Sequence, residues 1–236
     1  MNGKIFAGLT LVTAPITEPV TLADIKQQLR LDPFFTEEDA YLNTLISMAR
    51  QWCENYMRRA FITQSWRLAL RAWPGRDYAN SPSGVVADGL DSYYRHNHIG
   101  LPRPPLQSVT SVTYADTTNT IFTMPPGNIG GGYNVDTDPE PGRIVLPFSQ
   151  IWPTAILLPG SPIKITFVAG YTDAPTFLAK FEGAFAVCMA IRLLCAHWYD
   201  VRQPVTEPGK TAIGRDPLQS VIDLLKTHKN FETLSD

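Results

Sequence analysis

The stretch that most limits how this chain can fold is residues 183–198, with the sequence GAFAVCMAIRLLCAHW. As a helix it would be apolar on nearly every side, yet it is shorter than the roughly 20 residues that span a bilayer. It also contains Arg192 and His197. A helix that is apolar all round is buried inside a protein. We therefore expect its own domain to cover one side and a neighbouring subunit to cover the other.

The N-terminal part of the chain predicts two helices. Apolar residues at helical spacing follow Thr21, which suits an N-cap, and Pro33 ends this short helix. Thr36 with Asp39 resembles a capping box and predicts a second helix to about Met57. The apolar face of the second helix is predicted to hold Leu42, Leu45, Ile46, Ala49, Trp52, Cys53 and Tyr56.

The middle of the chain changes from helical to alternating periodicity. Trp66, Leu68 and Leu70 alternate with Arg67 and Arg71, which indicates a half-buried strand over 63–71. Further strands are predicted at 107–115, 120–124, 142–147 and 162–169.

The C-terminal part predicts helices again. One is expected from about Pro175 to Tyr199, and a terminal amphipathic helix is expected over about 217–227. Helices, then strands, then helices indicate an α+β fold with an antiparallel β block inserted between helical ends. We predict an N-terminal helical part over 1–60, a β-rich insertion over 61–172 and a C-terminal helical part over 173–236, with the two helical parts packed as one domain.

Charge and the start of the chain exclude several classes of protein. The net charge is −2 and the Lys and Arg residues are spread along the chain. Stable DNA binding needs a concentrated basic surface, so it is not expected here. Charged residues are 18% of the chain, below the usual quarter, which favours contact with other protein. The first residues do not resemble a signal peptide, and no membrane association is expected.

The motifs that could carry chemistry are incomplete. Gly209-Lys210-Thr211 lacks the earlier glycine and the strand of a phosphate loop. The Asp136-x-Asp138-x-Glu140 stretch has Pro141 where a calcium loop needs glycine, so a solvated turn is expected. A metal held by Asp91, His96 and His98 has weak support. We predict no catalytic residue, no cofactor and no metal site.

Three cysteines, Cys53, Cys188 and Cys195, lie in predicted helices. Their odd number and the absence of a C-x-x-C pair disfavour disulfides and zinc, so buried reduced thiols are expected. Residues 74–97 form a segment longer than ordinary loops, including Tyr78, Tyr93 and Tyr94. Because tyrosine gives contact area at low entropic cost, this segment is a candidate partner loop.

Several stretches, taken in order, resemble the head–tail connector proteins of tailed bacteriophages. Residues 19–30, PVTLADIKQQLR, are similar to that family's opening, and Ile62-Thr63-Gln64-Ser65-Trp66 to its I-x-T-Q-x-W strand. The stretch LPRPPLQSVTSVTY over 101–114 is close to L-P-x-x-P-L-x-S-V-x-S-V-x-Y. Residues 167–171, FVAGY, resemble the family's strand end before its long helix, and HWYDVR over 197–202 resembles H-W-Y-x-x-R. The resemblance covers about 15–203.

The resemblance implies a structural, non-enzymatic virion protein. Such adaptors, or head-completion proteins, are assembled in the host cytoplasm and bind the portal vertex after DNA packaging. They offer a platform to a stopper or tail-terminator protein, and they act as a ring, here expected to have twelve copies. The His197–Tyr199 cluster is expected to pack a helix end rather than to catalyse. Alternatives are another tail or baseplate protein, or a glycan-binding or hydrolase β domain.

The segment after 203 is expected to make the portal contact. Its linker disfavours a fixed conformation, and its helix has an apolar row that needs a groove in a partner or in its own domain. The predicted contact residues are Leu218, Val221, Ile222, Leu225 and Lys226.

Overall fold

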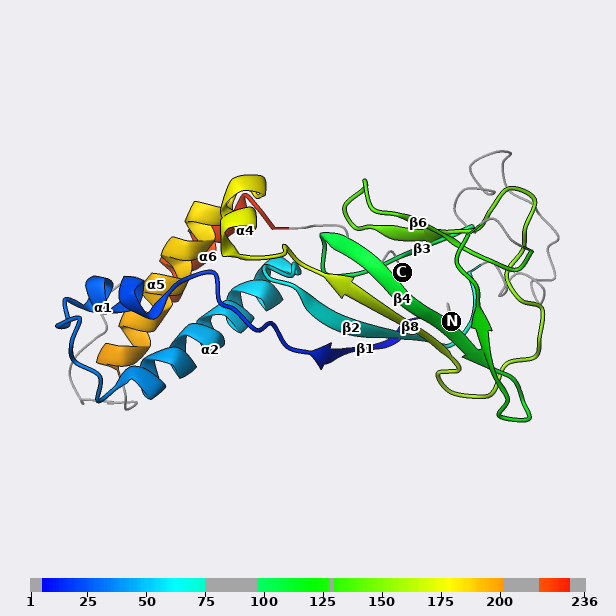
Figure 1. The fold of residues 1–236 in the computed structure, drawn as a ribbon, viewed down its shortest axis with the longest axis horizontal. Helices are drawn as coiled ribbons and strands as arrows, with labels where there is room; N and C mark the ends of the chain where they lie inside the picture. The colour runs from blue at the N-terminus through cyan, green and yellow to red at the C-terminus, as the bar shows by residue number, and fades with distance from the viewer. Residues whose placement is uncertain (1–5, 75–96, 128–129, 202–216, 230–236) are drawn as a thin grey trace. The chain divides into compact units, whose positions relative to one another are not determined.

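The computed structural model describes residues 6–74, 97–127, 130–201 and 217–229. The chain forms two compact units, shown as a ribbon in Figure 1. The β unit comprises 1–14 and 64–170 with 232–236, and the helical unit comprises 15–63 and 171–231. The helical unit is thus built from two stretches that are far apart in the sequence. The predicted α+β class is confirmed, with antiparallel sheets whose strands, apart from the N-terminal β1, fall between the helices in sequence.

The helical unit contains the described helices, whose bounds are α1 Leu22–Leu29, α2 Asp39–Met57, α4 Ala174–Lys180, α5 Ala184–Asp200 and α6 Pro217–Lys226. Thr21 caps α1 as predicted: its side chain accepts from the Asp24 N–H, and the Asp24 carboxylate accepts from the Thr21 N–H. Among the described residues, no helix is both long and apolar enough to traverse a bilayer.

Two predicted helix boundaries are wrong. The N-cap of α2 is Glu38, not Thr36, because the Asp39 carboxylate lies 2.7 Å from the Lys26 ammonium instead of turning back to cap the helix. The helix predicted over 175–199 is two helices, separated at Phe181–Gly183. A Cβ at Gly183 would lie 2.6 Å from Cγ of His228, so this position accommodates the imidazole ring that packs there.

The core of the helical unit joins both parts of the chain. Buried side chains of α1, α2, α4, α5 and α6 form one cluster, and α2 packs against α5. The rings of Phe61 and Phe177 pack at a tilt, with 5.4 Å between their centroids. The core also encloses ionic groups: Arg50 donates to Glu54 at 2.6 Å and to Glu18 at 2.7 Å.

The β unit has a five-stranded antiparallel sheet in the order β1-β2-β8-β4-β5 and a three-stranded sheet in the order β3-β7-β6. The strands are β1 Phe6–Thr13, β2 Gln64–Leu70, β3 His98–Gly100, β4 Leu106–Ala115, β5 Ile121–Met124, β6 Asn134–Asp136, β7 Arg143–Val145 and β8 Ile163–Ala169. The five strands predicted from alternation correspond to β2, β4, β5, β7 and β8. Gly170, at φ 104°, makes the turn that ends β8.

Candidate assembly surfaces

The outer face of α5 is apolar, because the helix has hydrophobic residues on the side that its own core does not cover. Phe185 is 74% exposed and Met189 is 44% exposed, one turn apart, and Leu193 continues the row half-buried. Arg192, on the same helix, bonds to Asp24 of α1 at 2.8 Å, and the exposed Glu182 lies just before the helix. We call Phe185, Met189 and Leu193 the α5 face.

The outer face of α2 has a different composition but is also uncharged. Within this helix, all of which the structure describes, the exposed residues are Ala40, Tyr41, Asn43, Thr44, Met48, Gln51 and Asn55. The three charged residues of α2 turn inward: Asp39 to Lys26, and Arg50 and Glu54 to each other. We call Tyr41, Thr44 and Met48 the α2 face.

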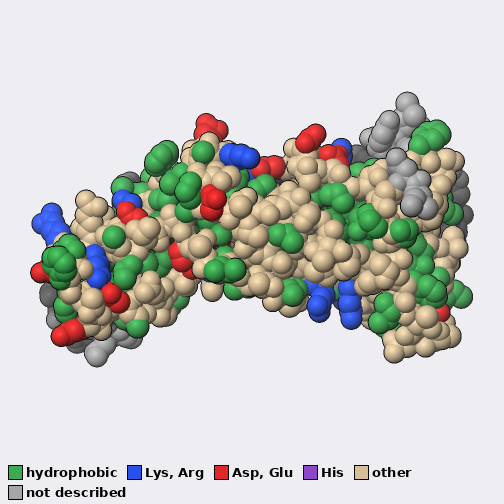
Figure 2. Space-filling model, in the orientation of Figure 1, with side chains coloured by type: hydrophobic (Ala, Val, Ile, Leu, Met, Phe, Trp, Pro, Cys, Tyr) green, Lys and Arg blue, Asp and Glu red, His purple; other side chains and the backbone are tan. Residues whose placement is uncertain are grey.

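On the face drawn in Figure 2, broad uncharged areas lie between the Lys, Arg, Asp and Glu side chains, several of which gather at the end of the helical unit. An uncharged surface costs little desolvation when another protein covers it. The α2 face contains no charged residue, and the α5 face is preceded by the exposed Glu182.

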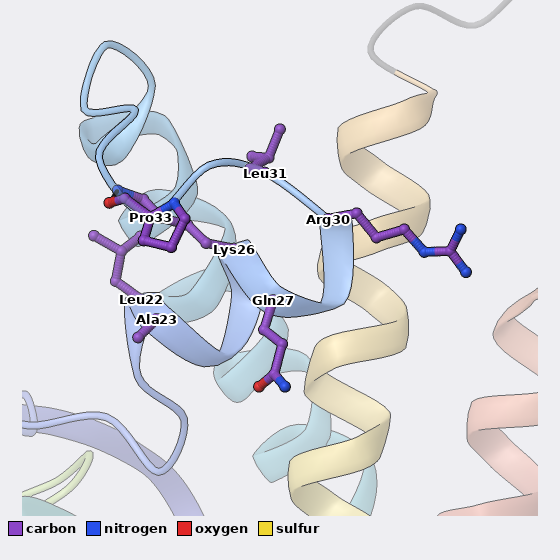
Figure 3. A pocket seen from close by; sticks show the side chains of 7 residues that line it. All are labelled: Leu22, Ala23, Lys26, Gln27, Arg30, Leu31 and Pro33. Carbon is purple, nitrogen blue, oxygen red and sulfur yellow. Dashed lines mark hydrogen bonds between the residues drawn. The ribbon is translucent and has the colours of Figure 1, made fainter.

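A third feature of the helical unit is an open pocket of about 470 Å³ beside α1 (Figure 3). Lys26 lies behind its rim, 6% exposed, and donates to the carbonyl oxygen of Phe35 at 2.7 Å while pairing with Asp39. The ammonium therefore fixes the 30–38 loop rather than offering a charge to a ligand. The lining residues are Leu22, Ala23, Lys26, Gln27, Arg30, Leu31 and Pro33.

The β unit has its own apolar surface, carried on a row of aromatic rings. Trp152 stacks on the buried Trp73 at 4.9 Å, Trp73 meets Tyr114 edge-on at 5.8 Å, and Tyr114 stacks on Phe122 at 5.3 Å. This row anchors the 147–157 loop beside strands β4 and β5. We call the exposed apolar residues of this region the β tip, namely Ile121, Phe122, Phe148, Ile151 and Ile156.

The predicted contact residues of α6 fall into two groups. Val221 and Leu225 are fully buried in the core of the helical unit, so α6 packs on its own subunit, which was the alternative considered from the sequence. Ile222 is half-buried and Lys226 is exposed. The side chain of Leu218 lies outside the described residues. The part of α6 that a second protein could contact is its exposed side, where Leu224 and Lys226 lie.

The tyrosines of the predicted partner loop, Tyr78, Tyr93 and Tyr94, lie outside the described residues, as do Asp91, His96 and the 209–211 stretch. Asp136, from the weak calcium pattern, pairs with Arg143 at 2.9 Å. Groups of three or more His, Cys, Asp or Glu side chains that could hold a metal are absent from the described part of the chain.

The C-terminal aromatic cluster of α5 packs against the start of α2. The Tyr199 hydroxyl donates to the Glu38 carboxylate, and the Tyr41 hydroxyl donates to the Trp198 carbonyl oxygen at 3.5 Å. His197 is half-buried in the last turn of the helix. These contacts fasten two helix ends and give the cluster a structural role.

The three cysteines are buried and free. Burial raises the pKa of the Cys53 thiol above its ordinary range, with the neighbouring Glu54 adding to the effect. Burial raises the pKa of Cys195 to about 12 and also raises the pKa of Cys188. Because the thiolate is the reactive form, these side chains are inert packing groups in the folded protein.

The α5 face, the α2 face and the β tip were not singled out residue by residue from the sequence. The low charge and the all-round apolar helix gave a signal for α5. For α2, the uncharged face depends on its three charged residues being turned inward. The sequence does not reveal this, because the partners of those residues are known only from the fold.

Comparison with known proteins gives one family match. Residues 19–119 match the family described as "Phage gp6-like head-tail connector protein", in agreement with the resemblance noted in the sequence. No curated protein matches the chain.

Solved structures match over nearly the whole chain. A protein in the neck of an empty gene transfer agent (GTA) particle, computed with C6 symmetry, is 23% identical with a TM-score of 0.63, covering 97% of this chain and 98% of that one. A protein of the native GTA virion is 22% identical with a TM-score of 0.62 and the same coverage. A protein of the native GTA neck, computed with C12 symmetry, is 21% identical with a TM-score of 0.61, again with the same coverage. These likenesses show that the two-unit fold is shared.

Proposed function

We propose that this chain, which carries a phage gp6-like head-tail connector region over residues 19–119, is an adaptor of a virion neck. Twelve copies would form a ring on the portal vertex after DNA packaging and give a stopper or tail-terminator protein its platform. The observation that carries the proposal is the agreement of two comparisons. The family match falls on α1 to β4, and the fold match to neck proteins extends over 97% of the chain.

The surface chemistry is consistent with a ring component. A ring in which each copy makes the same contact needs two patches on every subunit, and closure follows when the rotation between copies completes a circle. The helical unit offers two uncharged faces of this kind. DNA would pass through the channel without being held, because the chain has a net charge of −2 and no concentrated basic surface in its sequence.

For the portal contact we propose the exposed side of α6 together with the segment around it. Val221 and Leu225 fix this helix on the core, and Leu224 and Lys226 project from it. The half-buried Ile222 would form the edge of the contact. Leu224 and Lys226 flank the exposed side of α6, with the exposed Asp223 between them around the helix. A helix that is anchored by its own core on one side can present the other side to a groove in a partner.

The test is reconstitution with the portal protein of the same virion, followed by electron microscopy of the complex. We expect a layer of twelve copies on the portal and no binding to free DNA. A chain that ignores portal and instead builds six-fold or three-fold tubes would contradict the adaptor role and favour a tail protein.

A paired substitution locates the contact on α6. We expect Leu224→Glu with Lys226→Glu to weaken portal binding at least tenfold while the circular dichroism spectrum stays unchanged, since both side chains are exposed. The matched control is Gln219→Glu with Ser220→Glu on the same helix, where both residues are also exposed. Equal binding by both variants would remove α6 from the portal contact and leave 74–97 as the next candidate.

A further inference from the structure

The two uncharged faces of the helical unit lie on different sides of it. α2 and α5 pack through a common core, in which Cys53 of α2 is close enough to Cys195 for its charge to affect the pKa of the Cys53 thiol. Met48 on α2 and Met189 on α5 are both exposed, so each lies on the side of its helix that is turned away from this core. Figure 1 shows the two helices side by side.

We propose that neighbouring copies contact head to tail, with the α5 face of one copy packed on the α2 face of the next. This inference rests on the proposed ring and names the surfaces that build it. The occupant of each face is therefore a second copy of this chain. A contact between two different patches repeats around a ring, whereas a patch that pairs with itself stops at a dimer.

The side chains of the two faces have complementary sizes. On α5 the large Phe185 and Met189 project one turn apart. On α2 the smaller Thr44 lies between Tyr41 and Met48, and its hydroxyl already donates to the Ala40 carbonyl oxygen at 2.9 Å. Thr44 can thus be covered without leaving a polar group unsatisfied. Helices pack when a projecting row of one fits between rows of the other, which this order of large and small residues allows.

The charges around both faces are arranged to tolerate burial. Arg192 borders the α5 face and is paired with Asp24, while Arg50 and Glu54, the charged pair in the middle of α2, are only 4% exposed and are bonded to each other. Covering unpaired charges would cost several kcal/mol each. Arg192, Arg50 and Glu54 are thus each paired within the subunit before any neighbour arrives.

Cysteine cross-linking in assembled particles tests the contact. The double variant Phe185→Cys with Met48→Cys places one thiol on each face, and the three native thiols are buried. A short bismaleimide should join copy to copy and give a ladder of dimers, trimers and larger species up to a closed ring. Each single variant should stay monomeric, because in a head-to-tail contact its thiol does not meet another copy of itself.

The controls separate the possible failures. Phe185→Cys with Met189→Cys puts both thiols on the same face and should give no ladder. If the double variant is present in particles but gives no ladder, the proposed contact is wrong. If a single variant gives dimers, a two-fold contact replaces the head-to-tail one. If the chain is absent from particles altogether, the proposed neck function fails, and the ring with it.

A charge-complementation pair gives a second, independent readout. Met189→Lys and Met48→Glu should each abolish assembly alone, since each would bury an unpaired charge against a methionine. A mixture of the two variants should assemble again, because in an alternating ring the lysine of one copy meets the glutamate of the next. Assembly by either variant alone, or a mixture that stays unassembled while both variants are folded, would overturn the pairing.

Discussion

The two units of this protein achieve stability by different means. The helical unit encloses charged groups: Lys26, Arg50, Glu54 and Arg59 are each less than a tenth exposed. In the described part of the β unit, the buried polar or charged side chain is the uncharged Gln64, and the interior is formed by aromatic and aliphatic residues. All three cysteines lie in the helical unit, while Trp73 and its stacked partner Trp152 lie in the β unit.

This difference follows from how the chain builds each unit. The β unit joins 64–170 with the N-terminal stretch 1–14, and its strands, including the β1–β2 pair, are held by ladders of backbone hydrogen bonds. The helical unit must bring 15–63 together with 171–231. Buried ion pairs are weak evidence of stability, but breaking one is costly, so they favour one arrangement of α2 over others. We infer that these buried pairs help to select a single packing of the helices. Because the charged residues of α2 are turned inward to form them, the outer face of this helix stays uncharged.

The largest effect is expected from breaking the ionic core. Glu54→Ala removes the carboxylate that accepts from Arg50 at 2.6 Å and from the Phe61 N–H at 2.9 Å, and leaves the buried Arg50 guanidinium with Glu18 as its remaining carboxylate partner. We expect the free energy of unfolding of the helical unit to fall by about 3–5 kcal/mol. The rate of thiol labelling of Cys53, Cys188 and Cys195 reports opening of this unit.

Gln51→Ala is the matched control for this substitution, because Gln51 lies on the same helix and is exposed. It should change the free energy of unfolding by less than about 0.5 kcal/mol. A Glu54→Ala protein with unchanged labelling would show that the ion pair contributes no specificity, and the contrast between the units would be lost.

Shortening a buried aliphatic side chain tests the stability of the β unit in the same way. Ile165 is fully buried on the central strand β8, and Ile165→Ala should lower the free energy of unfolding by about 2–5 kcal/mol through the cavity it leaves. We expect a shift in the tryptophan fluorescence transition that Trp73 and Trp152 report. If Ile165→Ala also speeds labelling of the three cysteines by the amount expected from the same loss of free energy, the two units unfold together rather than separately.

The sequence predicts what depends on periodicity and misses what depends on distant neighbours. Alternation over 63–71 and helical spacing after Thr21 are local, and the structure follows both. The strands β3 and β6 have three residues each, too few to show a period, and β1 is largely exposed, so its pattern is weak. The proximity of His228 to Gly183 lies far outside any local pattern, which is why the helix break was missed.

The candidate surfaces show the same division. The amphipathic row of α6 is visible in the sequence, but only the fold shows that Val221 and Leu225 fill the subunit's own core. The uncharged α2 face is not visible as such, because Arg50 and Glu54 lie in the same helix. The sequence gives their spacing of four residues, and the structure shows that this pair is turned inward.

A smaller effect is expected at the break between α4 and α5. Gly183→Ala would place a Cβ 2.6 Å from Cγ of His228, so the ring must move out of its position against Phe181. We expect a loss of about 1–3 kcal/mol, as for other overpacked sites. The double variant Gly183→Ala with His228→Ala should recover much of this loss. A single variant as stable as the parent protein would show that the ring moves freely.

The smallest expected effect is on stability in acid. One carboxylate in each unit, Asp24 and Asp116, allows the acid response of the two units to be measured separately. The hydrogen bond from the Thr21 hydroxyl, at 2.7 Å, lowers the pKa of Asp24 below its ordinary value of 3.8, and the Thr21 N–H and Arg192 act in the same direction. In the β unit, hydrogen bonds from Thr118 and Thr120 lower the pKa of Asp116. In both cases the unfolded chain binds the proton more readily than the folded one.

The sign of the pH dependence follows from this difference. The stabilising contribution is complete above the unfolded pKa, near pH 4, and is lost as the pH falls through the lower folded pKa. Asp24→Asn should therefore flatten the acid limb of helical-unit stability, measured by thiol labelling after equilibration between pH 6 and pH 3, with labelling itself done at neutral pH. Asp116→Asn should flatten only the tryptophan transition of the β unit. If Asp24→Asn leaves the thiol profile as steep as in the parent protein, the capping carboxylate does not set the acid response of the helical unit.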